Sequence, residues 1–262
     1  MPRPSKRTRV AESLTDDRLL GGRVRISQPT HGYRVAIDPV LLAAAVPAQP
    51  GERVLDAGAG TGAASLCLAT RVPQCRIVGL ELQRSLQRIA RQNVTQNELE
   101  ARVEMIEGDL QRPPPRLAAA TFDHVMTNPP HLPANRASPS PERQRALARQ
   151  ETDLELVGWL AGCLRLLKQD GLLTLIHRTD RLNEVLAALQ GRAGDLVVFP
   201  LWPGAGQPAK RVLVQARKGA RGPLCLAPGL VLHGQGGSFS PKAEDVLRHG
   251  RALDLRDGWR RE

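Results

Sequence analysis

The residues of this chain with the clearest chemistry are Asn128-Pro129-Pro130-His131, which close a short apolar run over Phe122–Met126 after the single residue Thr127. That run has the length and composition of a buried strand. Farther upstream, a second strand-like run ends in the glycine-rich turn Asp56-Ala57-Gly58-Ala59-Gly60-Thr61-Gly62. Each motif alone is weakly specific. Together and in this order, they predict a methyl-donor pocket followed by a loop that activates an acceptor amine.

The chemistry expected of Asn128-Pro129 is the orientation of an NH2 group. An aromatic or amide NH2 is a poor nucleophile because its lone pair is delocalised. The Asn128 side-chain oxygen and the Pro129 carbonyl can accept its two hydrogens, which aims the lone pair at the donor methyl, in line with the departing sulfur. His131 would stack on the planar substrate, and a base within structured nucleic acid would have to be extruded to reach it. The alternative is that Asn-Pro-Pro merely ends a strand, since proline cannot continue a ladder.

The donor pocket is predicted from three strand ends. Glycines at 58 and 60 let the backbone approach a ligand and adopt positive φ, and the turn opens a helix whose N-terminus offers free N–H groups. Glu81 ends the next strand, where a carboxylate binds ribose hydroxyls, and Asp109 ends the third, where it can meet an adenine amino group. The charge of Asp56 suits the amino-acid part of an adenosyl-sulfonium ligand. A dinucleotide pocket competes, but its usual spacing is GxGxxG and here it is GxGxG; a plain glycine turn with surface acids is the other alternative.

Strand and helix patterns alternate from residue 53 onward. Strands are expected over 53–57, 76–82, 102–107, 122–127, 172–177, 196–201 and 211–217, with helices over 61–70, 85–97, 152–167 and 181–190. This alternation predicts an α/β fold with a mostly parallel sheet covered on both faces. Only Trp202–Lys210 joins the last two strands, which is too short for a parallel crossover, so the last strand should be antiparallel. A Rossmann-like seven-stranded sheet with its last strand reversed is the class I methyltransferase arrangement.

The remaining segments define the expected organisation of the chain. Residues 1–18 are expected to form a flexible basic tail, 19–218 the catalytic domain and 219–262 a C-terminal extension outside the sheet. In the lead-in, Leu19–Ile26 could form a hairpin, and Asp38 is expected to cap a helix over Pro39–Val46. Within the extension, a strand-like run covers 230–233 and a short helix 241–247. The long loop over 131–150 is expected to be functional or disordered.

Composition favours a polyanionic partner. The net charge is +11, from 37 Lys and Arg against 26 Asp and Glu, and aromatic residues make up only 3%. Basic residues expected near the mouth of the site, among them Arg178, Lys210 and Arg211, could contact phosphates; the alternative is a solvated surface of a basic protein. The four cysteines form no CxxC pair, which indicates buried free thiols in a reducing compartment and no metal site. No apolar run reaches 18 residues, so no membrane span is expected.

On these motifs the chain resembles the class I S-adenosyl-L-methionine (SAM)-dependent amino-methyltransferases with an Asn-Pro-Pro-aromatic motif. It is most similar to the bacterial tRNA1(Val) adenine-37 N6-methyltransferases. The resemblance covers residues 25–217 and extends to Gln28-Pro29, His31-Gly32-Tyr33-Arg34, Asp38-Pro39-Val40-Leu41-Leu42 and Lys210–Val214. The sequence departs from the motif at its last position, where His131 replaces the usual Tyr or Phe.

The resemblance implies a role for each candidate residue. SAM would be bound by Asp56, Gly58, Gly60, Glu81 and Asp109. The amine would be oriented by Asn128 and Pro129, within a catalytic motif that also includes Pro130 and His131. RNA would be contacted by Arg34, Arg178, Lys210 and Arg211.

The sequence thus predicts a cytoplasmic SAM-dependent methyltransferase, a monomer or weak dimer, that acts on an exocyclic amine of RNA, adenine-N6 in tRNA. Two alternatives stay open. One is a protein glutamine N5-methyltransferase, since release-factor enzymes share Asn-Pro-Pro, although they carry an N-terminal helical domain for which this lead-in is too short. The other is a noncatalytic RNA-binding protein with the same fold, which His131 suggests.

Overall fold

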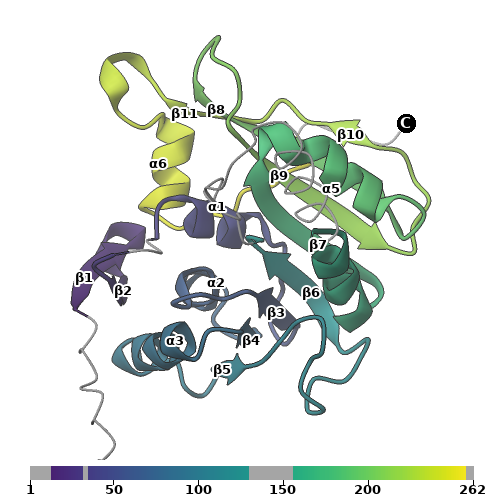
Figure 1. The fold of residues 1–262 in the computed structure, drawn as a ribbon. Helices are drawn as coiled ribbons and strands as arrows, with labels where there is room; N and C mark the ends of the chain where they lie inside the picture. The colour runs from purple at the N-terminus through teal and green to yellow at the C-terminus, as the bar shows by residue number, and fades with distance from the viewer. Residues whose placement is uncertain (1–12, 32–34, 130–155, 258–262) are drawn as a thin grey trace, which may run out of the picture.

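The computed structural model describes residues 13–31, 35–129 and 156–257. Its centre is a nine-stranded sheet with the order β10-β8-β9-β7-β6-β3-β4-β5, in which β11 also pairs with β8 (Figure 1). The strands are β3 (Arg53–Ala57), β4 (Arg76–Glu81), β5 (Val103–Glu107), β6 (Phe122–Thr127), β7 (Leu167–Arg178), β8 (Ala193–Gly204), β9 (Arg211–Lys218), β10 (Cys225–Leu226) and β11 (Leu230–His233).

Helices cover both faces of this sheet, as the alternating pattern predicts. They are α1 (Asp38–Ala45), α2 (Ala63–Arg71), α3 (Arg84–Gln96), α5 (Leu182–Leu189) and α6 (Pro241–Leu247), and residues 156–166 are also helical. One apolar core joins α1, α2, α3 and α6 to one face, and the other joins α5 and residues 156–166 to the opposite face. Successive strand residues point to opposite faces, so Val54 enters the first core and Leu55 the second.

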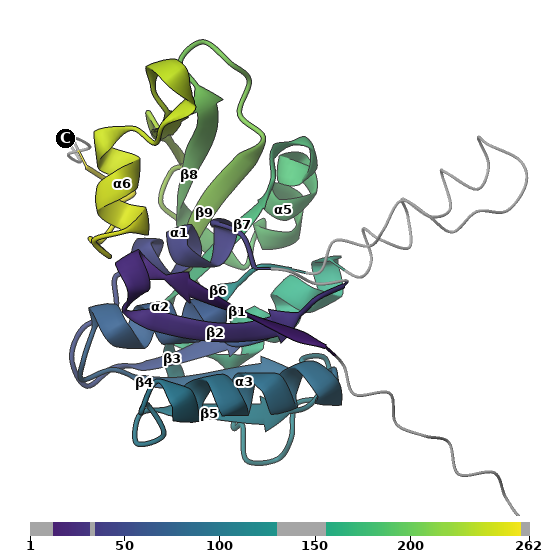
Figure 2. The same ribbon diagram turned by 90° about the vertical axis from the view of Figure 1, so that its left-hand side faces the viewer.

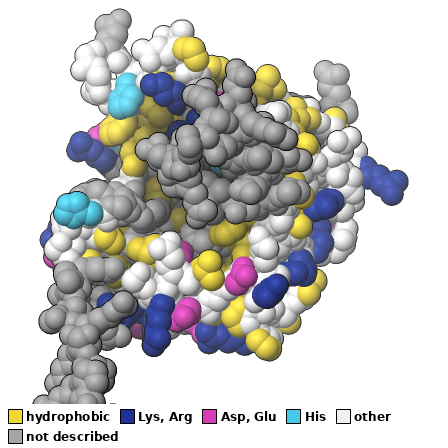
Figure 3. All heavy atoms as spheres, viewed as in Figure 1, with side chains coloured by type: hydrophobic (Ala, Val, Ile, Leu, Met, Phe, Trp, Pro, Cys, Tyr) yellow, Lys and Arg dark blue, Asp and Glu magenta, His cyan; other side chains and the backbone are white. Residues whose placement is uncertain are grey.

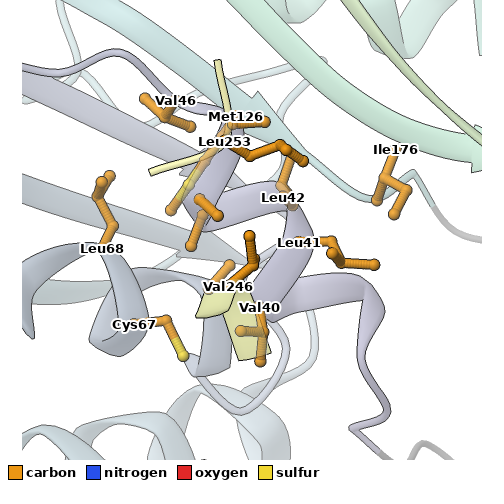
Figure 4. Packing of buried hydrophobic residues seen from close by; sticks show 14 of the residues in the cluster. Val40, Leu41, Leu42, Val46, Cys67, Leu68, Met126, Ile176, Val246 and Leu253 are labelled. Carbon is orange, nitrogen blue, oxygen red and sulfur yellow. The ribbon is translucent and has the colours of Figure 1, made fainter. Parts of the chain in front are cut away.

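Helix α1 is the centre of the first core. Seven of its eight residues are buried, and a helix apolar on nearly all sides must be enclosed on nearly all sides. Figure 4 shows Val40, Leu41 and Leu42 of α1 among Leu68 of α2, Met126 of β6 and Val246 of α6. The lead-in and the C-terminal extension are therefore packed into the same core as the central strands.

The strand order confirms the predicted methyltransferase sheet. β9 is antiparallel to both β7 and β8 and lies between them, whereas β3, β4, β5, β6 and β7 form parallel pairs. The helix expected over 152–167 ends at residue 166 in the structure, because Leu167 already pairs with Phe122 at the start of a longer β7.

The C-terminal extension differs from the prediction that it lies outside the sheet. Its strands β10 and β11 both pair in parallel with β8. β8 is twelve residues long, and without these strands its outer edge would leave a row of N–H and C=O groups unpaired. The short runs at 225–226 and 230–233 fill that edge, which their length alone did not indicate.

The N-terminal hairpin also begins earlier than expected. It comprises β1 (Leu14–Leu19) and β2 (Val24–Pro29), joined by the 3-10 turn η1 (Leu20–Gly22), so its first strand lies within the segment expected to be a tail. Figure 2 shows the hairpin lying across α2 and α3. Two further 3-10 turns are η2 (Thr179–Arg181) and η3 (Gln235–Gly237).

Asn93 on α3 and Asn97, which follows the end of this helix, attach the hairpin. Asn97 accepts from the Arg25 N–H at 2.8 Å and donates to its carbonyl at 2.7 Å. One turn earlier, Asn93 accepts from the Ser27 N–H at 2.8 Å and donates to the carbonyls of Ser27 and Thr61, both at 2.9 Å. The side-chain amides therefore take the place of a neighbouring strand for β2.

Replacement of Asn93 by Ala is expected to lower the free energy of unfolding by about 2–4 kcal/mol, because it leaves several backbone groups without partners. Urea unfolding measures the change. Gln92→Ala, on the exposed side of the same helix, should change stability by less than about 0.5 kcal/mol. An equal loss of stability in the two variants would show that the hydrogen bonds from Asn93 to the hairpin do not stabilise the fold.

Candidate active site

The predicted site residues converge at one edge of the sheet. The carboxyl ends of β6, β3, β4 and β5 follow one another across it, with Thr127 paired to Ala57, Ala57 to Leu80 and Glu81 to Glu107. Asn128, the glycine turn, Glu81 and Asp109 therefore follow one another along this edge, although Asp56 and Asn128 are 72 positions apart in the sequence. This edge is where open α/β sheets bind ligands.

The glycine turn is fixed to the end of β4 by its own backbone. Gly58 and Ala59 both donate to the Leu80 carbonyl, at 2.8 and 3.0 Å, and Gly60 donates to Oε2 of Glu81 at 2.8 Å. Gly58, Gly60 and Gly62 all have positive φ, a conformation that favours glycine. A Cβ on Gly58 would lie 2.9 Å from the Trp159 ring. The missing side chain at Gly58 thus makes room for a protein ring.

The two carboxylates expected to bind ribose and adenine have different environments. Glu81 is buried, with Oε2 accepting from Gly60 and Oε1 accepting from the Gln83 N–H at 2.8 Å. Each Glu81 oxygen keeps a lone pair for a ligand hydroxyl. Asp109 is half-buried and accepts from the Gln111 N–H at 2.8 Å. Backbone donors orient both groups before any ligand arrives.

Asp56 is almost completely buried and accepts a hydrogen bond from Ser65 Oγ at 2.7 Å. Burial raises the pKa of its carboxyl to about 6 from an ordinary value of 3.8, and the Ser65 hydrogen bonds oppose this shift. A buried carboxylate is costly, so a cation bound beside it would relieve that cost. Ser65, in the first turn of α2, was not expected as a partner.

Asn128 carries a buried acceptor atom at the end of β6. Its Oδ1 atom is buried and has no hydrogen-bond partner in the part of the chain that the structure describes. Leaving an amide oxygen in this state costs about 1–3 kcal/mol, and a ligand N–H would remove the cost. Pro129 beside it is buried. Pro130 and His131 lie outside the described residues.

Trp159 and Thr127 contact predicted site residues and were not named in the sequence analysis. Thr127 Oγ1 donates to the Ala57 carbonyl at 2.8 Å, and Trp159 Nε1 donates to Thr127 Oγ1 at 2.9 Å. Trp159 belongs to the helical residues 156–166, from which Arg165 donates to the carbonyls of Leu110 and Gln111, both at 3.0 Å. This helix therefore contacts the glycine turn, which is the predicted donor turn, and the loop after Asp109. The sequence signal that could have pointed to Trp159 was its residue type, because the chain has only three tryptophans.

The basic residues expected to bind RNA are partly neutralised. Arg178 and Arg211 are partners across β7 and β9. Arg178 forms a two-point ion pair with Asp180, which lowers the pKa of that aspartate, and Arg211 Nε donates to Asp38 Oδ2 at 2.9 Å. Asp38 therefore binds Arg211 and is not the expected helix cap, since it is the first residue of α1 and Ile37 occupies the cap position.

Lys210 is exposed beside Arg211, and Arg34 lies outside the described residues. On the face seen in Figure 3, the visible Lys and Arg side chains lie at several places around the rim rather than in one patch. The described residues include no metal-ligand cluster and no helix long and apolar enough to cross a bilayer. All four cysteines are buried and free.

Comparison with known proteins identifies the family. A family model described as a methyltransferase domain matches residues 54–150. A tRNA1(Val) (adenine(37)-N6)-methyltransferase of Aeromonas hydrophila is 33% identical over 211 residues, which are 80% of this chain and 86% of the relative. The chain belongs to this methyltransferase family. A relative of the same name from Bacteroides thetaiotaomicron is 33% identical over 159 residues, 59% of this chain and 64% of its own length.

The structural comparison agrees on the fold of this methyltransferase. A crystal structure from Agrobacterium tumefaciens, described as a predicted O-methyltransferase, matches with a TM-score of 0.69 and 28% identity, covering 82% of this chain and 97% of that one. The protein is a SAM-dependent methyltransferase of class I. The preoriented Glu81 and the glycine turn fit such a donor, which supplies the transferred methyl group when bound.

The raised pKa of Asp56 makes stability depend on pH. Between about pH 4 and 6 the folded protein keeps a proton that the unfolded chain has released, so the free energy of unfolding should fall as pH rises through this interval. Asp56→Asn has no titratable group at this position. Above pH 7 its free energy of unfolding should therefore exceed that of the wild type, by about 3 kcal/mol at most. Thermal or urea unfolding from pH 4 to 8 measures the difference. Glu100→Gln, at an exposed carboxyl, serves as the control; parallel wild-type and Asp56→Asn curves would contradict the burial effect.

Proposed function

We propose that this methyltransferase transfers a methyl group from SAM to the N6 amine of an adenine in tRNA, with adenosine 37 of tRNA1(Val) as the first candidate. The observation that carries the proposal is the buried Oδ1 of Asn128, which has no hydrogen-bond partner among the described residues and lies next to the glycine turn. The names of the relatives from Aeromonas and Bacteroides support the choice of substrate.

On the donor side, the proposed roles follow the strand ends. Glu81 would bind the ribose hydroxyls, and Asp109 would accept from the adenine amino group of the donor. The backbone at Gly58 and Gly60 would face the amino-acid part, whose ammonium group would lie near the Asp56 carboxylate. An ammonium in that position favours the ionised form of Asp56, so donor binding and the pKa of Asp56 would be coupled.

On the acceptor side, Asn128 Oδ1 and the Pro129 carbonyl would accept the two N6 hydrogens. The nitrogen lone pair then points at the donor methyl, and the proton leaves after transfer. Positioning and the exclusion of water would supply the rate. Pro130 would keep the segment rigid, and His131 would stack on the extruded adenine.

RNA would approach across the ends of β7 and β9. Lys210 would provide a phosphate contact, together with Arg34, whereas Arg178 and Arg211 would first have to exchange Asp180 and Asp38 for phosphate. Phosphate contacts of this kind position an RNA without reading its sequence. The four buried free cysteines support a cytoplasmic location, and a monomer or weak dimer is proposed for the assembly.

Incubation with SAM and an unmodified tRNA1(Val) transcript is expected to produce N6-methyladenosine, detected by mass spectrometry of the digested nucleosides. The same tRNA with guanosine at position 37 should remain unmethylated. Asn128→Ala should slow methylation by at least about 100-fold and leave binding of S-adenosylhomocysteine within a few-fold of wild type. Glu81→Ala should instead abolish binding of that ligand.

Three outcomes would overturn the assignment. A 2′-O-methylated nucleoside would show transfer to oxygen. Methylation of a release-factor glutamine without any methylated nucleoside would indicate a protein substrate. Binding of S-adenosylhomocysteine and tRNA, with no transfer to RNA or protein, would indicate a noncatalytic RNA-binding protein.

Lys210→Gln is expected to weaken tRNA binding and to reduce the slope of log affinity against log salt by about 1. Lys218→Gln removes the same charge at the opposite end of β9 and should leave the slope unchanged. Titration at several salt concentrations measures both. Equal slopes for the two variants would place the RNA elsewhere on the protein.

A further inference from the structure

The glycine turn follows β3 and Asn128 follows β6, and these two neighbouring strands part just before the site. β3 and β6 pair up to Ala57 and Thr127. The residue that follows β3, Gly58, donates its N–H to the Leu80 carbonyl of β4 and so turns away from β6. The next residues of β6 are Asn128 and Pro129, and proline has no N–H with which to continue the ladder. The backbone ladder therefore ends one residue short of both Gly58 and Asn128.

Trp159 bridges this separation. Its Nε1–H donates to Thr127 Oγ1 at 2.9 Å, and Thr127 Oγ1–H donates to the Ala57 carbonyl at 2.8 Å. The six-membered ring of the same indole faces Gly58, where atoms Cζ2 and Cη2 lie 2.9 and 3.0 Å from the place a Cβ would occupy. One side chain thus contacts the first glycine of the donor turn and the residue that precedes Asn128.

The ring is itself held by the core. Trp159 is packed against the second apolar cluster, and its neighbour Leu160 is completely buried there. Arg165, further along the same helical segment, is hydrogen-bonded to the loop after Asp109. The indole is therefore placed by a rigid element, as a group that sets distances must be.

We propose that Trp159 is a positioning residue which, through Thr127, sets the distance between the methyl donor and the amine held by Asn128. The proposal rests on the proposed function for the identity of the acceptor amine. The contacts of Trp159 with Thr127 and Gly58 do not depend on that function. Methyl transfer needs the reacting atoms about 3–3.5 Å apart and in line, and a displacement of about 1 Å can cost about 100-fold in rate. We call the hydrogen-bonded chain from Trp159 through Thr127 to the Ala57 carbonyl the clasp. Loss of the clasp would let the ends of β3 and β6 move relative to each other while each keeps its own ligand contacts.

Three variants isolate the clasp. Trp159→Phe keeps an aromatic ring near Gly58 and removes the N–H, Thr127→Val keeps the shape and removes the hydroxyl, and Thr127→Ser keeps the hydroxyl. Trp202→Phe is the matched control, because Trp202 Nε1 also donates one hydrogen bond, to the Pro228 carbonyl at 3.0 Å, but lies on β8. Melting temperature, affinity for S-adenosylhomocysteine and the single-turnover rate of methyl transfer to tRNA are measured for each.

Trp159→Phe and Thr127→Val are each expected to slow single-turnover transfer by about 10–100-fold and to change the affinity for S-adenosylhomocysteine by less than about 3-fold. The double variant should be no slower than the slower single variant, because both changes break one unit. Thr127→Ser, which keeps the hydroxyl, and Trp202→Phe should both transfer the methyl group at close to the wild-type rate. A wild-type rate in Trp159→Phe, or a loss of rate matched by loss of ligand affinity, would overturn the proposal.

A second readout does not depend on the substrate. The indole N–H resonance of Trp159, identified by its absence in Trp159→Phe, should shift when S-adenosylhomocysteine binds, in the wild type and in Thr127→Ser. The resonance of Trp202 should not. If the ligand binds and the Trp159 resonance stays in place, the clasp does not sense the donor turn and the proposal fails. If the resonance shifts but no tRNA is methylated, the proposed substrate is wrong and the clasp stands.

Discussion

The parallel pairing of β3 with β6 is the constraint on which the site depends. It places the glycine turn and Asn128, which are far apart in the sequence, at the same edge of the sheet, with Ala57 and Thr127 as the last pair before each chain leaves the ladder. A methyl group can be transferred only between atoms held a few ångströms apart. The helical residues 156–166 reinforce this pairing, because Trp159 Nε1 donates to Thr127 Oγ1, which donates to the Ala57 carbonyl.

Polar groups in the site are oriented at a cost in stability. Glu81 is buried with two backbone donors, Asp56 is buried with one hydroxyl donor, and Asn128 Oδ1 has no donor among the described residues. Each of these groups is less well solvated than it would be in water. A ligand that supplies hydroxyls, an ammonium group and an amine would complete all three, so the same arrangement that weakens the fold favours binding. The apolar cores on the two faces of the sheet offset this cost.

The periodic parts of the fold could be predicted because local pattern determines them. The strands at 53–57 and 122–127 have the predicted bounds, the helix at 241–247 likewise, and the short link over 202–210 correctly implied an antiparallel last strand. The errors lie where a partner decides the structure. β10 and β11 joined the sheet because β8 had a free edge, and β1 formed within the expected tail because β2 paired with it. Neither partner is visible from the residues of the segment itself.

The sequence by itself determined the order of chemical groups along the chain: a glycine turn after one strand, acids after the next two and an amide with a proline after the fourth. Because carboxyl ends of parallel strands share an edge, this order already implied one site. Only the tertiary structure decided what each group contacts. It pairs Arg211 with Asp38, buries Asp56 against Ser65, and places Trp159 over Gly58. These contacts join residues from elements that are distant in the chain, and side-chain packing, which no local pattern encodes, selects them.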